Sequence, residues 1–237
     1  MATRKIEYRE GDTIFEGHMA WDDSTSEPRP AVLVSHAWGG RDDFSCERAE
    51  DLAALGYVGF ALDVYGKGIR GGSVEENQAL MTPMLEDRAL LRRRLAAALA
   101  CIREQSEVNA RRIAAIGYCF GGLCVLDMAR SGADLRGVVS FHGLLSGPEG
   151  IANRQINSKI LVLHGHDDTM VPPEQVLTFE QEMTAAGADW QLHAYGHTQH
   201  SFTNPEANNP DLGAAYQPDA ARRSWASMQA FLGEVLD

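Results

Sequence analysis

The sequence has no apolar run that approaches the ~20 residues a helix needs to cross a bilayer. Its opening segment, MATRKIEYREGD, lacks the apolar core of a cleavable signal peptide. Basic residues are also few, since 21 Lys and Arg stand against 33 Asp and Glu and leave a formal net charge of −12. Nucleic acids and anionic membranes bind basic surfaces, so we expect neither as a partner. These absences predict a soluble, cytoplasmic protein.

Cysteine is scarce as well, and the four cysteines form no C-x-x-C pair and no zinc-finger spacing. We therefore expect free thiols in a reducing compartment. Cys46, Cys101 and Cys124 fall within helical patterns and are typical of small apolar core residues. Cys119 differs, because it lies in the segment IGYCFGG between an apolar run and a helical pattern. It is either a nucleophile or a buried apolar residue, and the rest of the chain has to decide.

Repeats, low-complexity tracts and long linkers are absent, so we expect residues 1–237 to form a single domain. Two alternating segments near 4–9 and 13–21 predict an antiparallel hairpin. Short apolar runs then alternate with helical patterns, which predicts an α/β fold with a mostly parallel sheet of about eight strands flanked by helices. The further predicted strands are 31–36, 57–63, 112–117, 137–142, 159–165 and 189–196, and the predicted helices are 43–55, 84–105, 121–131, 173–186 and 217–236.

Ligands of such sheets bind beyond the carboxyl ends of the strands, so polar residues at those ends matter most. Cys119 follows strand 112–117 within G-x-C-x-G, which has the shape of the G-x-S-x-G turn that carries a nucleophilic serine. Asp168 follows the strand that ends at 165, and His200 follows the last strand. The order nucleophile, acid, histidine along the chain is that of the α/β-hydrolases. We therefore predict that these three residues form a catalytic triad.

The sequence resembles the dienelactone hydrolase family of α/β-hydrolases over nearly its whole length. The segments that carry the resemblance are G-x-C-x-G-G at 117–122, G-x-x-D-x-x-V-P at 165–172, H-S-F at 200–202 and ALDVYGKG at 61–68. By this resemblance Cys119 matches the nucleophile, Asp168 the acid and His200 the base. The resemblance implies an α/β-hydrolase fold, a small ester or lactone as substrate, and no cofactor.

The chemistry of these residues agrees with that role. A thiol attacks best as its thiolate, and His200 either takes the proton or pairs with the anion as imidazolium. Asp168 would fix the tautomer of the imidazole and stabilise its charged form. We expect the backbone N–H groups of Phe120 and Trp38 to receive the charge that develops on the carbonyl oxygen. The predicted function is cysteine-dependent hydrolysis of esters or lactones through a thioester; the alternatives are an acyltransferase on the same scaffold and a non-catalytic binding protein.

Several residues near the predicted site have a plainer interpretation. Asp167 competes with Asp168 for the role of the acid, but we assign it to the turn. His193, His197 and His200 have the spacing H-x-x-x-H-x-x-H, but a strand end separates them, so we expect no metal site. Three further histidines at strand ends are expected to be hydrogen-bonded scaffold: His36, His142 and His164.

The predicted substrate contacts rest on the resemblance. Lys67 stands where the family carries an arginine that contacts the substrate's carboxylate, and Tyr65 and Phe202 are expected in the wall of the pocket. The chain departs from the family at Ala37, where the family has a glutamate, and at Asn204, where it has a second arginine. Neutral esters and differently shaped lactones are therefore also expected substrates. We expect the pocket to be walled by loops at 38–44, 65–85, 143–157 and 201–216, and the protein to be a monomer or a small homo-oligomer.

Overall fold

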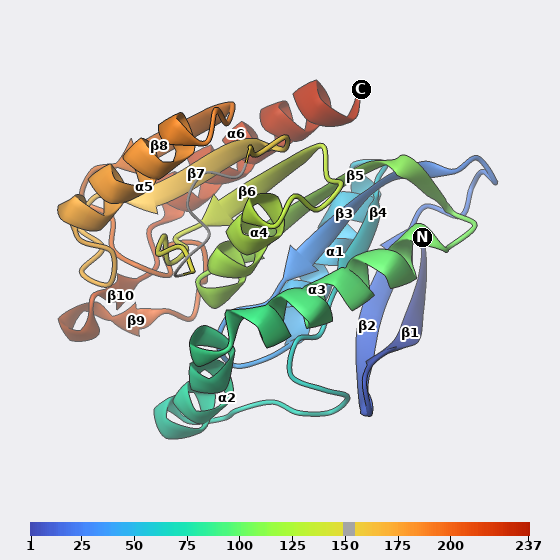
Figure 1. The fold of residues 1–237 in the computed structure, drawn as a ribbon, viewed down its shortest axis with the longest axis horizontal. Helices are drawn as coiled ribbons and strands as arrows, with labels where there is room; N and C mark the ends of the chain where they lie inside the picture. Colours follow the sequence, from blue (N-terminus) through green and yellow to red (C-terminus); the bar gives the residue numbers. More distant parts are fainter. Residues whose placement is uncertain (149–154) are drawn as a thin grey trace. The chain divides into compact units, whose positions relative to one another are not determined.

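The computed structural model describes residues 1–148 and 155–237, so part of the predicted loop 143–157 lies outside the described residues (Figure 1). The fold is mixed α/β, and its eight longer strands belong to one sheet. The chain divides into two compact units, Met1–Ile116 and Gly117–Asp237, which we describe separately. That the whole chain is a single domain stays a prediction. Within the described residues, every helix is too short or too polar to span a bilayer.

The first unit begins with the predicted antiparallel hairpin. Strands β1 (Ala2–Glu10) and β2 (Thr13–Trp21) pair in the register Tyr8 opposite Phe15, and their rings stack at 5.3 Å between centroids. Strand β2 also pairs with β4 (Val58–Ala61) in the antiparallel direction, and β4 pairs with β3 (Arg29–Ser35) in the parallel direction. All residues of β4 are buried, which explains why this strand has a continuous apolar sequence.

Three helices belong to the first unit: α1 (Asp43–Ala54), α2 (Val74–Glu86) and α3 (Arg88–Arg103). Helix α1 begins at a capping box in which Asp42 and Ser45 bind each other's backbone N–H groups. It packs so closely on β4 that a Cβ at Gly59 would lie 2.0 Å from the carbonyl oxygen of Ala49. The sequence therefore needs glycine at this contact.

Helix α2 corrects the prediction that residues 65–85 form a loop. Ser73 caps its N-terminus by accepting a hydrogen bond from the N–H of Glu76, and Asp87 ends α2 and at the same time caps α3. The predicted helix 84–105 is therefore two helices with a break at Asp87. Figure 1 shows α2 and α3 as successive helices, and they contact each other.

The second unit holds the end of β5 (Val108–Tyr118) and strands β6 (Gly137–Phe141), β7 (Lys159–Gly165) and β8 (Trp190–Tyr195). Strands β6, β7 and β8 are parallel neighbours, as in the pairs Val139 with Leu161 and Val162 with Leu192. Their carboxyl ends therefore meet at one edge of the sheet, where the predicted site lies. The helices are α4 (Phe120–Arg130), α5 (Pro173–Ala185) and α6 (Pro218–Leu236), and a short ribbon joins β9 (Asn208–Asn209) to β10 (Ala214–Ala215).

Candidate active site

Cys119 occupies a strained turn between β5 and α4. Its backbone angles are φ 55° and ψ −117°, and it is the residue before the first turn of α4. Its N–H donates to the carbonyl of Phe141 over 3.0 Å, which ties the turn to the end of β6. Positive φ in a residue with a side chain is costly and is found where the surrounding structure enforces it. The strand-to-helix turn predicted from G-x-C-x-G is present, and Cys119 is partly exposed at its tip.

The glycines around Cys119 are required by close backbone contacts. A Cβ at Gly117 would lie 2.0 Å from the carbonyl oxygen of Gly121, inside the turn itself. A Cβ at Gly122 would lie 2.5 Å from Oγ of Ser140 and 2.7 Å from Cα of Gly143. Helix α4 therefore approaches β6 closely only because these positions lack side chains. The thiol stands at the N-terminus of this helix, where the helix dipole favours an anion.

His200 and Asp168 form a buried pair. Nδ1 of His200 lies 2.7 Å from Oδ2 of Asp168, and the two side chains are 2% and 0% exposed. The other carboxylate oxygen, Oδ1, accepts a hydrogen bond from the N–H of Met170. Asp167 is exposed, and its N–H donates to the carbonyl of Thr198. The structure thus places Asp168, rather than Asp167, against the imidazole.

The backbone of His200 is anchored by the short ribbon that follows it. Its N–H donates to the carbonyl of Gly213 over 2.9 Å, and its carbonyl accepts from the N–H of Ala215 over 3.1 Å. The next residue, Ser201, has φ 58° and turns the chain back. Because main chain and side chain are both fixed, the orientation of the imidazole is set before any substrate arrives.

The electrostatics of His200 link it to Cys119. Burial of the ring lowers its pKa, but the charge of the Cys119 thiolate and the hydrogen bond with Asp168 outweigh this and raise the pKa to about 10. Nε2 has no hydrogen-bond partner of standard geometry among the described residues, so the link between the two residues is mainly one of charge. Beside a thiolate at this position, the imidazole holds its proton at neutral pH.

A second histidine, His142, lies beside His200, and the sequence alone did not predict this contact. The rings of His142 and His200 are 5.1 Å apart between centroids and meet edge to face. Nε2 of His142 lies 2.8 Å from Oγ1 of Thr203, so the expected hydrogen bond of a scaffold residue is present. Burial lowers the pKa of His142 well below its usual value, and the charge of His200 lowers it further. The only signal in the sequence is that His142 directly follows a buried strand.

His164, at the end of β7, is also buried, and burial lowers its pKa. Phe202, which we expected in the pocket wall, is fully buried and packs on the rings of His142 and Tyr195. The side-chain Oδ1 of Asn204 accepts from the N–H of Glu206. The role of Phe202 in substrate binding stays a prediction.

The remaining predicted residues belong to the first unit. Both ring nitrogens of His36 are hydrogen-bonded to the backbone, Nδ1 to the carbonyl of Ala37 and Nε2 to the N–H of Val64, so the prediction of a scaffold role is confirmed. The hydroxyl of Tyr65 donates to the carbonyl of Trp38 over 2.9 Å and holds that loop. The predicted oxyanion donor at Trp38 and the predicted substrate contact of Tyr65 stay predictions.

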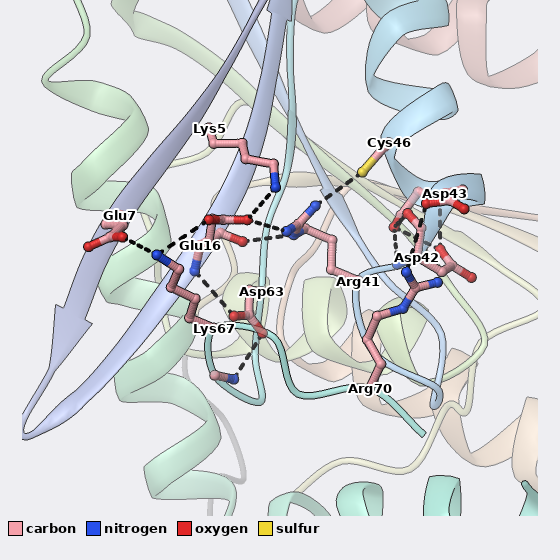
Figure 2. A network of polar contacts seen from close by, with 12 residues as sticks. Lys5, Glu7, Glu16, Arg41, Asp42, Asp43, Cys46, Asp63, Lys67 and Arg70 are labelled. Atoms are coloured by element: carbon pink, nitrogen blue, oxygen red, sulfur yellow. Dashed lines mark hydrogen bonds and ion pairs between the residues drawn. The ribbon is translucent and has the colours of Figure 1, made fainter. Parts of the chain in front are cut away.

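Lys67 is already paired with carboxylates of its own unit. Figure 2 shows its ammonium group between Glu7 and Glu16, and Glu16 also receives Lys5 and Arg41. A carboxylate on a substrate would have to compete with these two side chains for Lys67. Its predicted contact with substrate therefore also stays a prediction.

Within residues 1–148 and 155–237, no three His, Cys, Asp or Glu side chains lie together in a way that would hold a metal ion. His197 is exposed at the turn after β8, whereas His200 is buried against Asp168.

Residues 15–236 match the dienelactone hydrolase family, so the chain belongs to this family of hydrolases and has its α/β fold. A solved structure named m3DLH is 39% identical, covers 100% of this chain and 99% of its own, and superimposes with a TM-score of 0.94. A second one, the dienelactone hydrolase-like promiscuous phosphotriesterase P91 from metagenomic libraries, is 38% identical with the same coverage and TM-score. A Bradyrhizobium protein named "Probable 2-oxo-3-(5-oxofuran-2-ylidene)propanoate lactonase" is 27% identical over 86% of this chain and 83% of its own.

Proposed function

We propose that this protein hydrolyses carboxylic esters and lactones with Cys119 as nucleophile, His200 as acid and base, and Asp168 as the residue that orients His200. The observation that carries this proposal is the buried pair of His200 and Asp168. The Cys119 thiolate and the Asp168 carboxylate raise the pKa of His200 to about 10 and outweigh the opposite effect of burial. Membership of a hydrolase family supports the same reaction class.

In the first half-reaction, the Cys119 thiolate attacks the carbonyl carbon, and the carbonyl electrons move to oxygen. Phe120 directly follows the nucleophile and is the first residue of α4, the position that supplies an oxyanion donor in the related G-x-S-x-G turn, so we assign its N–H as one donor to this oxyanion. One such donor is typically worth about 3 to 4 kcal/mol. His200 then gives its proton to the leaving alkoxide as the carbon–oxygen bond breaks. The products are an alcohol and a thioester on Cys119.

In the second half-reaction, His200 is neutral and accepts a proton from a water molecule. The thiolate that raised the pKa of His200 is now part of a thioester, so the pKa of His200 is lower in this intermediate. The imidazolium that forms therefore gives up its proton more readily. The hydroxide attacks the thioester, the carboxylic acid leaves, and the electron pair returns to sulfur. The proton on His200 restores the resting ion pair.

A lactone follows the same steps, except that the leaving hydroxyl remains on the acyl group and the product is a hydroxy acid. Names of relatives in the family include a lactonase, which supports this substrate class. With Lys67 engaged by Glu7 and Glu16, we expect neutral esters to be accepted as well as anionic ones. The measurement is a comparison of kcat/KM for neutral and anionic esters in Lys67→Met and in the unaltered protein.

The deciding experiment follows the hydrolysis of p-nitrophenyl acetate by purified variants. We expect Cys119→Ala and His200→Ala to lose on the order of 10³-fold or more in kcat/KM, because the removed groups act as one unit. Cys101→Ala is the matched control, since Cys101 is a half-buried cysteine on α3 and should leave activity unchanged. Full activity in Cys119→Ala would refute the proposal.

Two alternatives are distinguished from hydrolysis by two further measurements. An acyltransferase would pass the acyl group of the thioester to an added alcohol or amine faster than to water, which analysis of products shows directly. A non-catalytic binding protein would leave Cys119 no more reactive toward iodoacetamide than an ordinary thiol at the same pH. We expect hydrolysis products and a rapidly alkylated Cys119.

We also propose that the site turns over phosphotriesters as a second activity. The 38% identical structure that covers the whole chain is named as a promiscuous phosphotriesterase, which supports this class. The thiolate would attack phosphorus, expel the aryloxide and leave a phosphorylated sulfur for water to release. Diethyl p-nitrophenyl phosphate should give at least one p-nitrophenolate per protein molecule, and none from Cys119→Ala. A release that persists in that variant would rule this activity out at Cys119.

A further inference from the structure

The loop that carries His200 is fixed to the neighbouring strand by a side chain that lies outside the triad. His142 directly follows β6 and is buried, and its backbone N–H donates to the carbonyl of Leu163 in β7 over 2.8 Å. Its ring lies edge to face against His200 at 5.1 Å between centroids. Phe202, two residues after His200, also meets the ring of His142 edge to face, at 5.2 Å between centroids. The ring of His142 therefore fills the space beside the catalytic imidazole.

One hydrogen bond joins His142 to this loop. Its Nε2 lies 2.8 Å from Oγ1 of Thr203, which is three residues after His200. Nδ1 of His142 is buried and has no hydrogen-bond partner of standard geometry among the described residues. The bond with Thr203 is therefore the hydrogen bond that ties the ring to the loop of His200, and the tautomer of the ring sets which of the two groups donates.

Backbone strain marks the same place. Within residues 1–148 and 155–237, positive φ among residues other than glycine occurs only in the second unit, at Cys119, His142, His197 and Ser201. Cys119 is the nucleophile of the proposed triad, and His197 and Ser201 flank its base. His142, with φ 38°, shares their conformation, and such strain persists only where the surrounding structure enforces it.

We propose that His142 is a positioning residue: through its hydrogen bond to Thr203 and its contact with the ring of His200, it holds the imidazole in the orientation that serves Cys119. This proposal rests on the proposed function, because it needs His200 to be the base. Asp168 fixes His200 from the loop after β7, and His142 fixes it from the end of β6. Two anchors on different strands restrict the ring more than either does alone.

The ring of His142 suits this task because it remains neutral. Burial, followed by the charge of His200, holds the pKa of His142 well below its usual value. A neutral ring packs against an imidazolium without repulsion, whereas a second positive charge at this distance would oppose the proton on His200. The ring thus supports the charged state of His200 without competing for its proton.

The test compares Thr203→Val, which removes the hydroxyl at nearly constant volume, with Thr203→Ser, which keeps it. Two rates are measured: p-nitrophenyl acetate hydrolysis, as kcat and KM, and alkylation of Cys119 by iodoacetamide. We expect Thr203→Val to lower kcat about three- to tenfold, the range of one net hydrogen bond, with KM changed less than about twofold. Thr203→Ser should restore kcat to within about twofold of the unaltered protein.

A matched control and a double variant separate positioning from general damage. Thr198→Val removes another hydroxyl from the same loop, one that donates to the carbonyl of Gly196 in the described structure, and should leave kcat within about twofold. His142→Asn tolerates positive φ but is too short to reach Thr203. In that background Thr203→Val should have no further effect, because both changes remove the same bond.

The proposal is overturned if Thr203→Val matches the unaltered protein in both rates, if Thr203→Ser is no better than Thr203→Val, or if the two changes are additive in the double variant. Thermal unfolding of each variant shows that the differences are measured on folded protein. Failure of the proposed function is distinguishable, since hydrolysis would then persist in Cys119→Ala and His200→Ala. Alkylation of Cys119 reports on His142 and Thr203 even in that case.

Discussion

Replacing Asp168 by asparagine probes the buried pair at the centre of the site. The carboxylate accepts the Nδ1–H of His200 over 2.7 Å, and neither side chain is more than 2% exposed. Asparagine keeps the shape and removes the charge. Its amide group can also turn its N–H₂ toward Nδ1, in which case the proton of the imidazole moves to Nε2 and the ring cannot accept a proton on the side of Cys119.

The expected loss follows from these contacts. A hydrogen bond to a charged group contributes roughly 1.5 to 3 kcal/mol, which corresponds to about ten- to 150-fold in rate. The wrong tautomer adds to this, and in a serine protease the corresponding substitution costs about 10⁴-fold. We therefore expect kcat/KM to fall about 10²- to 10⁴-fold. We also expect the pKa of His200 to fall, since the bond to Asp168 is one of the contributions that raise it to about 10.

The assay is p-nitrophenyl acetate hydrolysis by Asp168→Asn, with Asp167→Asn as the matched control. Asp167 is the exposed neighbour on the same turn and makes no side-chain contact with His200 in the described structure, so its kcat/KM should stay within about twofold. A loss in Asp167→Asn that equals or exceeds the loss in Asp168→Asn would refute the assignment of the acid. An Asp168→Asn variant with nearly full activity would refute the role of the carboxylate.

Three further outcomes are expected. Gly122→Ala places a Cβ 2.5 Å from Oγ of Ser140 and should lower the free energy of unfolding in urea by about 1 to 3 kcal/mol. Gly196→Ala, which has open space around it, should leave that free energy unchanged, and equal effects of the two changes would contradict the packing. His142 has a lowered pKa in the folded protein, so below pH about 6.5 its side chain takes up a proton in the unfolded chain but not in the folded one. The free energy of unfolding should therefore fall toward pH 5, with His142 contributing up to about 1.4 kcal/mol per pH unit, and the fall should be less steep in His142→Asn. Because His200 has a pKa of about 10, kcat/KM should fall above that pH as the imidazolium loses its proton. The rate of alkylation of Cys119 should not fall in the same range, and a parallel fall of the two rates would contradict the assigned roles.

Strands β3 to β7 were predictable because most of their residues are buried, whereas the more polar β8 is only partly buried. Each of the apolar runs from 31–36 to 189–196 corresponds to a strand of the structure, with ends that differ by a few residues. Gly56 and Gly187, which follow α1 and α5, have φ of 95° and 64°, as expected of glycines that end helices. In such segments local pattern and tertiary packing agree, so the sequence is sufficient.

Helix α2 was missed for physical reasons. Pro83 lies inside it, and proline usually ends a helix. Only Met84 of its residues is buried, so the helix shows no apolar periodicity along its length. Ser73 followed by Glu76 was the available signal, since this spacing is typical of a helix N-terminus.

The candidate site was predictable where chain order and strand ends define it, as for Cys119, Asp168 and His200. The contact of His142 with Thr203 was not predictable, because it joins residues 61 positions apart and involves positive φ at His142 and at Ser201, two residues before Thr203. The pairing of Lys67 with Glu7 likewise depends on the register of the first hairpin, which the alternating pattern does not specify.

The most direct test is to capture the acyl group on the protein. The protein is mixed with a p-nitrophenyl ester of a bulky acid, quenched in acid within the first turnover, and measured as intact mass before peptide mapping. We predict a mass increase of one acyl group on Cys119 that neutral hydroxylamine removes, and no increase in Cys119→Ala. An acyl group on any other residue, or rapid ester hydrolysis by Cys119→Ala, would contradict Cys119 as the nucleophile.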